Sequence, residues 1–547
     1  MTPIRPASRR TSLALLLTLL AAVSVLSQQQ PPSSSSKCVQ ITLLQVNDVY
    51  QFMPVDRGTS GGLARVSTLR KQIMKDSPNT LFLFSGDTIS PSVESLEPSG
   101  EVSSAGKPVR LQGRQMIDAW NQIGLDYATL GNHEFDFGPD VLLQRMKESK
   151  FQWLAANVLD KSGKSFGGMP PFVVREVGGI KLGLFGILLP DTKTTSSPGP
   201  DVQILNSCET AKRVVPQMRA AGAQVIVAIT HLSMQEDKEL AHCVPEIDII
   251  IGGHEHTLLQ SLAGRTPIFK MTADARQLGR YDLTVDAATG KLQSVDWQVI
   301  PVNDKVEDDP EFAVINEKYK HLLASYKEMV GRTRVRLEAG SEASRTGETN
   351  VGDFITDAFR QAMGADVALL NGGSIRADTT FEPGPLSRHD VQAILPFSTE
   401  VVKIAVTGAT LRKALENGVS QSGPGTEPGR FPQVSGLRFS FETSSPVGSR
   451  VKRVTVNGQP LDDKKTYTLA TNVYLIGGGD GYDMFKNAKL LTKTGESQID
   501  ADILRKAIAV AADGIAPQTD GRIEWMNKPA DDNKSQCVIA APVGNKQ

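Results

Sequence analysis

The chain has 547 residues, of which 40% are hydrophobic and 22% charged, and its formal net charge is −1. The length predicts two large domains, and the composition is that of an ordinary globular protein. The near-neutral charge excludes a global field that attracts polyanions, so we expect no nucleic acid polymer as a partner.

The N-terminus has the pattern of an export signal. Three arginines precede an apolar core at 13–25, which is too short for a typical membrane span. Residues 1–27 are therefore predicted to be a signal peptide, with an uncleaved membrane anchor as the alternative. The following spacer at 28–37 is rich in Pro, Ser and Gln and is predicted to be disordered. We expect a secreted or periplasmic protein with no stable membrane span after signal removal.

The mature chain contains four cysteines, Cys38, Cys208, Cys243 and Cys537. An oxidising compartment permits disulfides, and four cysteines allow three pairings. Cys208 and Cys243 are nearest in sequence and lie in one predicted domain, which favours that pair. Four unpaired thiols are the alternative.

Residues 38–303 alternate short apolar runs with helical patterns. Runs that predict buried strands lie at 41–46, 80–86, 127–132, 151–158, 181–188, 225–231 and 247–253. Helical patterns lie between them, at 62–74, 114–124 and 208–222. This alternation predicts an α/β layered domain.

A charged boundary begins at Asp304. A pattern without Gly or Pro at 311–330 predicts a long helix, so residues 304–331 are expected to connect two domains. The second domain, at 332–526, mixes helical and strand patterns and is predicted to be α/β or α+β. The polar end of the chain, at 527–547, is predicted to be a flexible tail.

Five short blocks follow predicted strands of the first domain and carry metal-ligand side chains. The blocks VNDVY, SGDTIS, GNHEFD, ITHLS and GGHEH contain Asp48, Asp87, Asn132, His231, His254 and His256. Two close divalent cations need a bridging carboxylate, a second carboxylate, an amide oxygen and several imidazoles. We expect the blocks to converge at the strand ends of one sheet. Imidazole ligands favour Zn²⁺, Mn²⁺, Co or Fe over Mg²⁺ or Ca²⁺.

These blocks resemble those of calcineurin-like metallophosphatases. GNHEFDFG, with NGGSIR and GGGDGY further along, narrows the resemblance to the secreted 5′-nucleotidase family over about residues 39–525. The resemblance implies an N-terminal four-layer metallophosphatase domain, which is a β-sandwich flanked by helices. A connecting helix and a C-terminal mixed α/β substrate-binding domain would follow.

The resemblance also implies roles for the ligand residues. Asp48 and Asp87 match the two aspartate ligands, with Asp87 bridging the ions. The second ion would be held by Asn132, His231 and His254, and His256 matches a ligand of the first ion.

Tyr50 departs from the family pattern, which usually reads D-x-H at this point and uses the histidine as a ligand of the first ion. Three interpretations remain open. Tyr50 is a spectator that leaves the ion with more water, or a phenolate ligand that favours Fe³⁺, or a residue that fills space and hydrogen-bonds a group around the ligands.

His133 and Asp136 lie three residues apart in GNHEFD. The resemblance implies that this pair lies beside the scissile phosphate. A carboxylate that holds one ring nitrogen fixes the tautomer of the imidazole and stabilises its charged form. The imidazolium would then stabilise negative charge that develops on the phosphoryl group.

The second domain is expected to bind the nucleotide. By resemblance, Asn371 and Arg376 of NGGSIR contact it, and Arg345 lies near the first substrate arginine of the family. Phe397 and Tyr474 match the two rings that sandwich the nucleobase, and Asp480 matches the acid that binds the ribose hydroxyls.

The expected function is extracytoplasmic removal of the 5′-phosphate of nucleotides by attack of a metal-activated water. Two other activities would use the same site, a 2′,3′-cyclic-nucleotide phosphodiesterase and a pyrophosphatase of nucleotide sugars or dinucleotides. A nucleotide-binding protein whose catalysis has decayed through Tyr50 is a third alternative. The sequence does not determine the preferred base, the metal or the oligomeric state.

Overall fold

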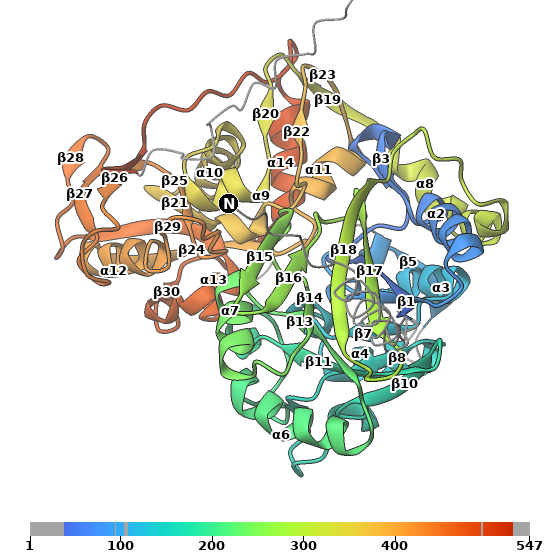
Figure 1. Cartoon of the computed structure of the whole chain (residues 1–547). Coiled ribbons are helices and arrows are strands. Elements are labelled where there is room, and N and C mark those ends of the chain that lie inside the picture. The colour runs from blue at the N-terminus through green and yellow to red at the C-terminus, as the bar shows by residue number, and fades with distance from the viewer. Residues whose placement is uncertain (1–37, 93, 103–107, 494–495, 529–547) are drawn as a thin grey trace, which may run out of the picture.

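The computed structural model describes residues 38–92, 94–102, 108–493 and 496–528. The predicted signal peptide and spacer, and nearly all of the predicted tail, lie outside this part of the chain. Figure 1 shows the first domain in blue to green and the second in yellow to red.

Two six-stranded sheets form the centre of the first domain. The order in one is β18 (Leu292–Pro301), β17 (Gln277–Asp286), β1 (Cys38–Val46), β4 (Thr80–Phe84), β7 (Tyr127–Thr129) and β8 (Gln152–Leu154). The order in the other is β10 (Val173–Val177), β11 (Ile180–Leu188), β13 (Val225–His231), β14 (Ile249–Gly252), β16 (Thr266–Lys270) and β15 (Leu259–Ala263). All seven predicted strands lie in these sheets.

Side-chain alternation along the strands explains why the sheets stack. Ile41 and Leu43 of β1 join a core between the two sheets, which also contains Val227 of β13. Leu44 and Val46 point the other way, into a second core under the helices. Because successive strand residues face opposite sides, each apolar strand serves both cores.

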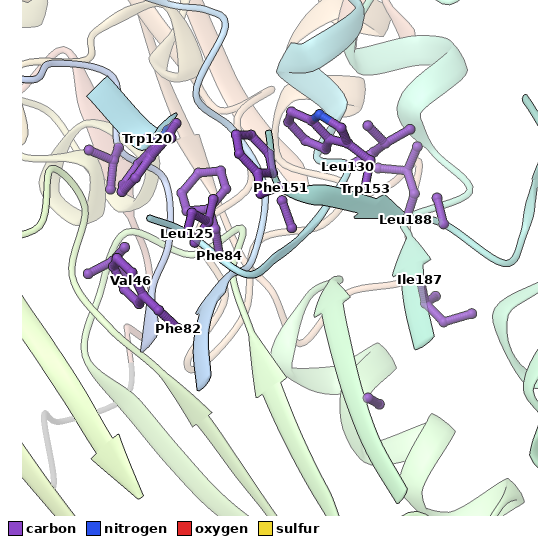
Figure 2. Close-up of a cluster of buried hydrophobic side chains, with 14 of the residues drawn as sticks. Val46, Phe82, Phe84, Trp120, Leu125, Leu130, Phe151, Trp153, Ile187 and Leu188 are labelled. Atoms are coloured by element: carbon purple, nitrogen blue, oxygen red, sulfur yellow. The ribbon is translucent and has the colours of Figure 1, made fainter. Parts of the chain in front are cut away.

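Helices cover the outer faces of the two sheets. On one side lie α2 (Leu63–Asp76) and α3 (Arg114–Ile123), and on the other α6 (Ser207–Ala220) and α7 (Met234–Cys243). The ring centroid of Trp120 in α3 lies 5.0 Å from that of Phe84 and 6.2 Å from that of Phe82. Figure 2 shows these three side chains. The first domain is thus the four-layer sandwich that the resemblance implied.

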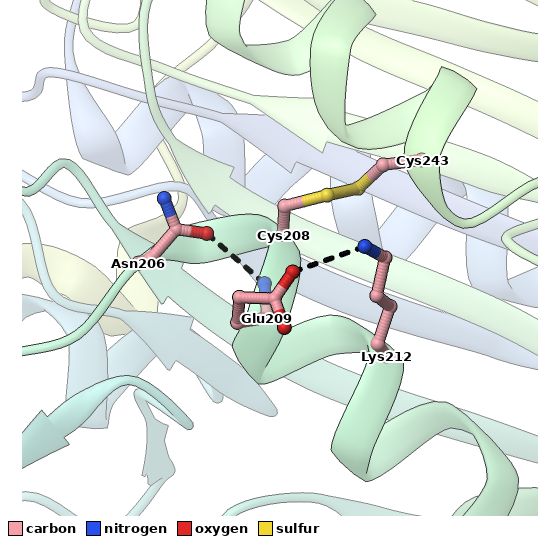
Figure 3. The surroundings of a disulfide bond; sticks show 5 residues. All are labelled: Asn206, Cys208, Glu209, Lys212 and Cys243. Carbon is pink, nitrogen blue, oxygen red and sulfur yellow. Dashed lines mark hydrogen bonds and ion pairs between the residues drawn. A yellow bond between two sulfur atoms is a disulfide. The ribbon is translucent and has the colours of Figure 1, made fainter.

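A disulfide joins Cys208 near the start of α6 to Cys243 at the end of α7, as favoured from the sequence (Figure 3). Asn206 caps α6 by accepting a hydrogen bond from the backbone N–H of Glu209 at 3.0 Å. Cys38 is exposed, and Cys537 lies outside the described residues.

The connecting helix is shorter than predicted. The turn η5 (Pro310–Phe312) leads into α8 (Ala313–Tyr326), and the residues expected to form the last helical turn belong to β19 (Met329–Thr333). β19 pairs with β23 (Gly384–Ser387), so a strand ladder satisfies backbone groups that a longer helix would have paired within itself.

The second domain is built on a mixed sheet. Its order is β25 (Pro432–Ser435), β21 (Val367–Asn371), β29 (Thr466–Asn472), β24 (Glu400–Thr407) and β30 (Lys489–Leu490), with β31 (Gln498–Ile499) also paired to β24. A smaller sheet contains β28 (Gln459–Pro460), β27 (Val451–Val456), β26 (Leu437–Phe441) and β32 (Ile523–Trp525).

Three helices flank the larger sheet, α10 (Asn350–Met363), α12 (Gly408–Gly418) and α14 (Asp500–Ala509). Ala368 and Leu370 of β21 pack in one core with α10 and α14, whereas Val367 and Leu369 pack in another with α12. The polar loops after β21 and β29 are therefore held by a sheet that is buried on both faces. No helix in the described part of the chain has both the length and the apolar character needed to cross a membrane.

Candidate metal centre and substrate cavity

The predicted metal ligands come from both sheets of the sandwich, so the expectation of one sheet was wrong. Asp48, Asp87 and Asn132 follow β1, β4 and β7 of the first sheet. His231 ends β13, and His254 follows β14, in the second. The sheets are stacked, so their loops meet at one end of the sandwich, and the residues still converge.

The backbone around the predicted ligands is left-handed at unusual places. Asp48 has φ 52°, Asp87 has φ 68° and His254 has φ 85°. Such conformations are uncommon for non-glycine residues and persist where the surroundings impose them. The backbone of Gly131 also packs closely against Asp87, because an added Cβ would lie 2.1 Å from Oδ1 of Asp87. The loops are therefore fixed in order to aim side chains inward.

The carboxylates of Asp48 and Asp87 and a ring nitrogen of His231 offer ligand atoms that all lie within 4.8 Å of one another. Oδ1 of Asn132 and Nε2 of His231 are buried without a hydrogen-bond partner among the described residues. The His231 ring meets the carbonyl of Ser85 through Nδ1 at 2.7 Å, which turns Nε2 toward Oδ2 of Asp87 at 3.2 Å. Buried acceptors without donors are what a bound cation would satisfy, so these residues fit a metal site.

The two carboxylates are held ionised. Burial opposes this, but the hydrogen bond with His256 and the nearby His231 lower the pKa of Asp48 to about 2. Burial is likewise overcome at Asp87, where His231 and His133 lower the pKa to about 2. Burial lowers the pKa of His254 well below its ordinary value, which keeps that ring neutral. Burial opposes the charge on His231, but Asp87 raises the pKa of that ring to about 9, so a bound cation would replace its Nε2 proton.

The hydroxyl of Tyr50 lies among the predicted ligands of the first ion. Its hydroxyl lies 3.4 Å from Oδ1 of Asp48, 3.3 Å from Oδ2 of Asp87 and 3.0 Å from Nε2 of His256. Arg376 of the second domain donates to the same hydroxyl at 2.5 Å, and its guanidinium lies 5.1 Å from the centre of the Tyr50 ring. Tyr50 is therefore in contact with the ligand residues and is 3% exposed.

His133 and Asp136 form the expected pair. Nδ1 of His133 lies 2.8 Å from Oδ2 of Asp136, and Oδ1 of Asp136 accepts from the hydroxyl of Ser196 at 2.7 Å. The backbone N–H of His133 donates to Oδ1 of Asp87 at 2.9 Å, which ties the pair to the metal centre.

Sequence reasoning left two buried groups without a role. Glu134 accepts from the backbone N–H groups of Gly131, Asp87 and Thr88 at 2.5, 2.9 and 2.7 Å, which joins the second and third blocks. Lys270 is fully buried and donates to the carbonyl of Gly253 at 2.9 Å, beside Asp237 at 3.0 Å. The position of Glu134 within GNHEFD was the only signal available, whereas Lys270 ends a strand that carried no motif.

One cavity of about 680 Å³ joins the two domains at the metal centre. Its lining from the first domain includes Asp87, Asn132, His133, Asp136, His254 and His256. Its lining from the second domain includes Arg345, Asn371, Arg376, Phe397, Tyr474 and Asp480. Every predicted substrate residue therefore faces the same space as the metal centre.

Two buried arginines give this cavity its positive charge. Arg345 is 6% exposed and Arg376 is 8% exposed, and Nε of each lacks a hydrogen-bond partner among the described residues. A buried guanidinium N–H without an acceptor is costly, and an anionic group in the cavity would offer acceptors to both arginines.

The hydroxyl of the half-buried Tyr474 lies between two acceptors. It lies 3.0 Å from Oδ1 of Asp480 and 3.0 Å from the carbonyl of Thr194 across the domain interface. A Cβ on Gly479 would lie 2.4 Å from the ring, so only glycine fits there. Asn371 donates to the other oxygen of Asp480 at 2.7 Å. Phe397 of the second domain also reaches the first domain, where its ring centroid lies 5.7 Å from that of His133.

Family models match both parts of the chain. The calcineurin-like phosphoesterase model matches residues 41–258, and the model of the 5′-nucleotidase C-terminal domain matches residues 329–487. Protein 5NUC of Lutzomyia longipalpis is 31% identical, over 83% of this chain and 87% of its own length. The crystal structure of a 5′-nucleotidase precursor from Thermus thermophilus is 30% identical, with a TM-score of 0.81 over 90% of this chain and all of that one.

The chain belongs to the 5′-nucleotidase family. It is thus a metal-dependent phosphoric-ester hydrolase of the calcineurin-like type. The trifunctional nucleotide phosphoesterase protein YfkN of Bacillus subtilis is also similar, at 30% identity over 89% of this chain. The chain spans only 35% of the length of that relative.

Proposed function

We propose that this 5′-nucleotidase family member removes the 5′-phosphate of nucleotides, giving nucleoside and inorganic phosphate. The observation that carries the proposal is the single cavity of about 680 Å³ that the metal centre and the predicted nucleotide residues line together. A phosphate at the metal centre and a base between the rings can therefore belong to one molecule.

Two divalent ions would be held by overlapping sets of residues. The first-ion set is Asp48, Asp87 and His256 with Tyr50 beside them, and the second-ion set is Asp87, Asn132, His231 and His254. The ions, Zn²⁺, Mn²⁺ or Co²⁺ with iron as an alternative, would supply the Lewis acidity that activates water and neutralises phosphoryl charge. The orphaned acceptor of Asn132 and the approach of His231 to the Asp87 carboxylate support this assignment.

His133 would act on the phosphoryl group from the first domain. Asp136 holds Nδ1 of His133, so the opposite ring nitrogen, Nε2, is available to the substrate. In the protonated form this ring would stabilise the negative charge that builds up on the phosphoryl oxygens.

The second domain would supply positioning. Arg345 and Arg376 would pair with the phosphate, because both guanidinium groups are buried and incompletely satisfied. Phe397 and Tyr474 would stack on the base, and Asp480 with Asn371 would accept and donate at the ribose hydroxyls. Holding phosphate and base at fixed positions lowers the entropic part of the barrier.

We also infer that the protein works outside the cytoplasm. The disulfide between Cys208 and Cys243 supports an oxidising compartment, and the N-terminal sequence pattern agrees with export.

Phosphate release by the purified chain tests the proposal. Nucleoside 5′-monophosphates should be hydrolysed faster than 2′,3′-cyclic nucleotides, nucleotide sugars, dinucleotides and sugar phosphates, and a chelator should stop the reaction. Asp87→Asn is the matched inactive control, because it keeps the shape and removes the charge between the two ion sets. A chain that binds nucleotides yet releases no phosphate with any of Zn²⁺, Mn²⁺, Co²⁺ or Fe²⁺ would be a binding protein and would refute the proposal.

A further inference from the structure

Asp378 of the second domain touches a predicted metal ligand of the first. It lies two residues beyond Arg376, in the loop after β21, and its Oδ2 forms a very short contact with Nδ1 of His256. Both side chains are buried, at 7% exposed for Asp378 and 3% for His256. The two residues are 122 positions apart in the chain, so only the packing of the two domains brings them together.

The second domain holds the other oxygen of the Asp378 carboxylate. Its Oδ1 accepts from the backbone N–H of Ser341 at 3.2 Å and from the hydroxyl of the same residue. Ser341 is 4% exposed and begins α9 (Ser341–Thr346). Asp378 also has φ 49°, an uncommon backbone conformation that its surroundings impose. The carboxylate is therefore built to present Oδ2 at one place.

This contact determines which nitrogen of His256 is left for a cation. A carboxylate accepts hydrogen bonds, so Nδ1 of His256 donates to Asp378, and Nε2 is the nitrogen that a cation would bind in place of its proton. Nε2 faces the first-ion set, 3.4 Å from Oδ1 of Asp48 and 3.0 Å from the hydroxyl of Tyr50. The tautomer and the direction of the ring are those of a metal ligand.

The second-ion set is supported differently. His231 is oriented by the carbonyl of Ser85, at 2.7 Å from Nδ1, and both residues belong to the first domain. The Nδ1 partner of His231 thus lies in the same domain as the ring, whereas the Nδ1 partner of His256 belongs to the second domain.

We propose that Asp378 is a positioning residue that completes the first-ion site from across the domain interface. This inference rests on the proposed function. The segment from Asn371 to Asp378 also carries Arg376, so the loop that engages the nucleotide is the loop that orients His256. Binding at one of these places then favours binding at the other, because such coupling is reciprocal.

Metal titration of the full chain tests the inference without using activity. The chain is stripped with a chelator and titrated with Zn²⁺ against a fluorescent indicator, and His256→Ala identifies the step that belongs to the first ion. Asp378→Asn keeps the size of the side chain and tolerates the left-handed backbone. It should weaken that step by roughly 10–100-fold and change the other step by less than about twofold. Ser341→Ala, which removes the hydroxyl donor to Oδ1 of Asp378 and keeps the backbone donor, should weaken the same step by a smaller factor.

Arg388→Gln is the control for loss of an interdomain contact. Arg388 forms an ion pair with Glu97 of the first domain at 3.8 Å, and neither residue is a predicted ligand. Both titration steps should therefore be retained. Unchanged affinities in Asp378→Asn, or an equal loss in both steps together with a lower Tm, overturn the inference. A wild-type chain that takes up fewer than two ions also overturns the inference. Phosphate release from a nucleotide, measured on that same sample, shows whether the proposed function fails as well.

Discussion

The hydroxyl of Tyr50 lies 3.0 Å from Nε2 of His256, at the position where the family pattern has a histidine ligand. The same hydroxyl is within 3.4 Å of both aspartates and accepts from Arg376. Of the three interpretations of Tyr50, this arrangement supports a residue that fills space and hydrogen-bonds the groups around the ligands. Burial raises the pKa of Tyr50 well above its ordinary value, which favours a neutral phenol that hydrogen-bonds the ligands.

We therefore expect the purified protein to lack the visible charge-transfer band of an iron phenolate. Tyr50→Phe should keep both ions and lose less than about tenfold in kcat/KM, because Arg376 loses one partner. Metal analysis and an absorption spectrum of both proteins check this. A coloured wild type whose band disappears in Tyr50→Phe would establish the phenolate interpretation instead.

Glu134 offers a second test, because it joins two loops that carry ligands. Glu134→Gln replaces an oxygen that accepts from backbone N–H groups by an amide that donates, which leaves buried donors unpaired. The free energy of unfolding should fall by about 1–3 kcal/mol. Denaturant unfolding measures this, with Glu239→Gln on the exposed face of α7 as the control. Equal stability of the two variants would mean that Glu134 does not hold the loops.

Local patterns were enough to predict most of the first domain and the residues around the cavity. Apolar runs that end in Asp, Asn or His became strands such as β4 and β13, because buried strands must carry their polar groups at the ends. Which sheet each strand joins is not a local property, and this is why the ligand residues were expected at the strand ends of one sheet instead of two.

Contacts between the domains were also beyond sequence reasoning. Asp378 had no motif of its own, and its contact with His256 depends on how two independent cores are docked. The end of α8 was misjudged for a related reason, since Met329 pairs with Ser387 in a strand ladder that only the fold of the second domain provides.

The titration of Asp353 should make the free energy of unfolding depend on pH. Its side chain is 2% exposed, and its Oδ1 lies 3.3 Å from Nε of Arg522. Burial, opposed by Arg522 and reinforced by the neighbouring Glu348, raises the pKa of Asp353 to about 8. The folded chain therefore holds a proton that the unfolded chain, with an ordinary pKa near 3.9, has lost.

Between about pH 4 and pH 8 this group should make the free energy of unfolding fall as the pH rises, by at most about 1.4 kcal/mol per pH unit. Asp353→Asn should remove that slope and stabilise the protein above pH 8. Denaturant unfolding across this range measures it, with Asp502→Asn, a half-exposed acid in the first turn of α14, as the control. A slope that persists in Asp353→Asn would assign the proton to another group.

The two rings of the cavity test whether nucleotides are the substrate class. Phe397 and Tyr474 both line the space that the metal centre faces, and neither contacts a predicted metal ligand directly in the way that Tyr50 does. Phe397→Ala and Tyr474→Ala should each raise the barrier for nucleotide hydrolysis by up to ~1–3 kcal/mol, which is the value of a full base stack. Hydrolysis of a small phosphate ester, which reaches the metal centre without stacking, should change little.

The ratio of kcat/KM values between wild type and variant converts each loss into free energy on the two substrates. Tyr474→Phe separates stacking from hydrogen bonding, because it keeps the ring and removes the hydroxyl that meets Asp480 and Thr194. We expect it to retain most of the nucleotide activity. Equal losses on nucleotide and small ester in both alanine variants would make the rings structural, and the protein would then be an unspecific metallophosphatase.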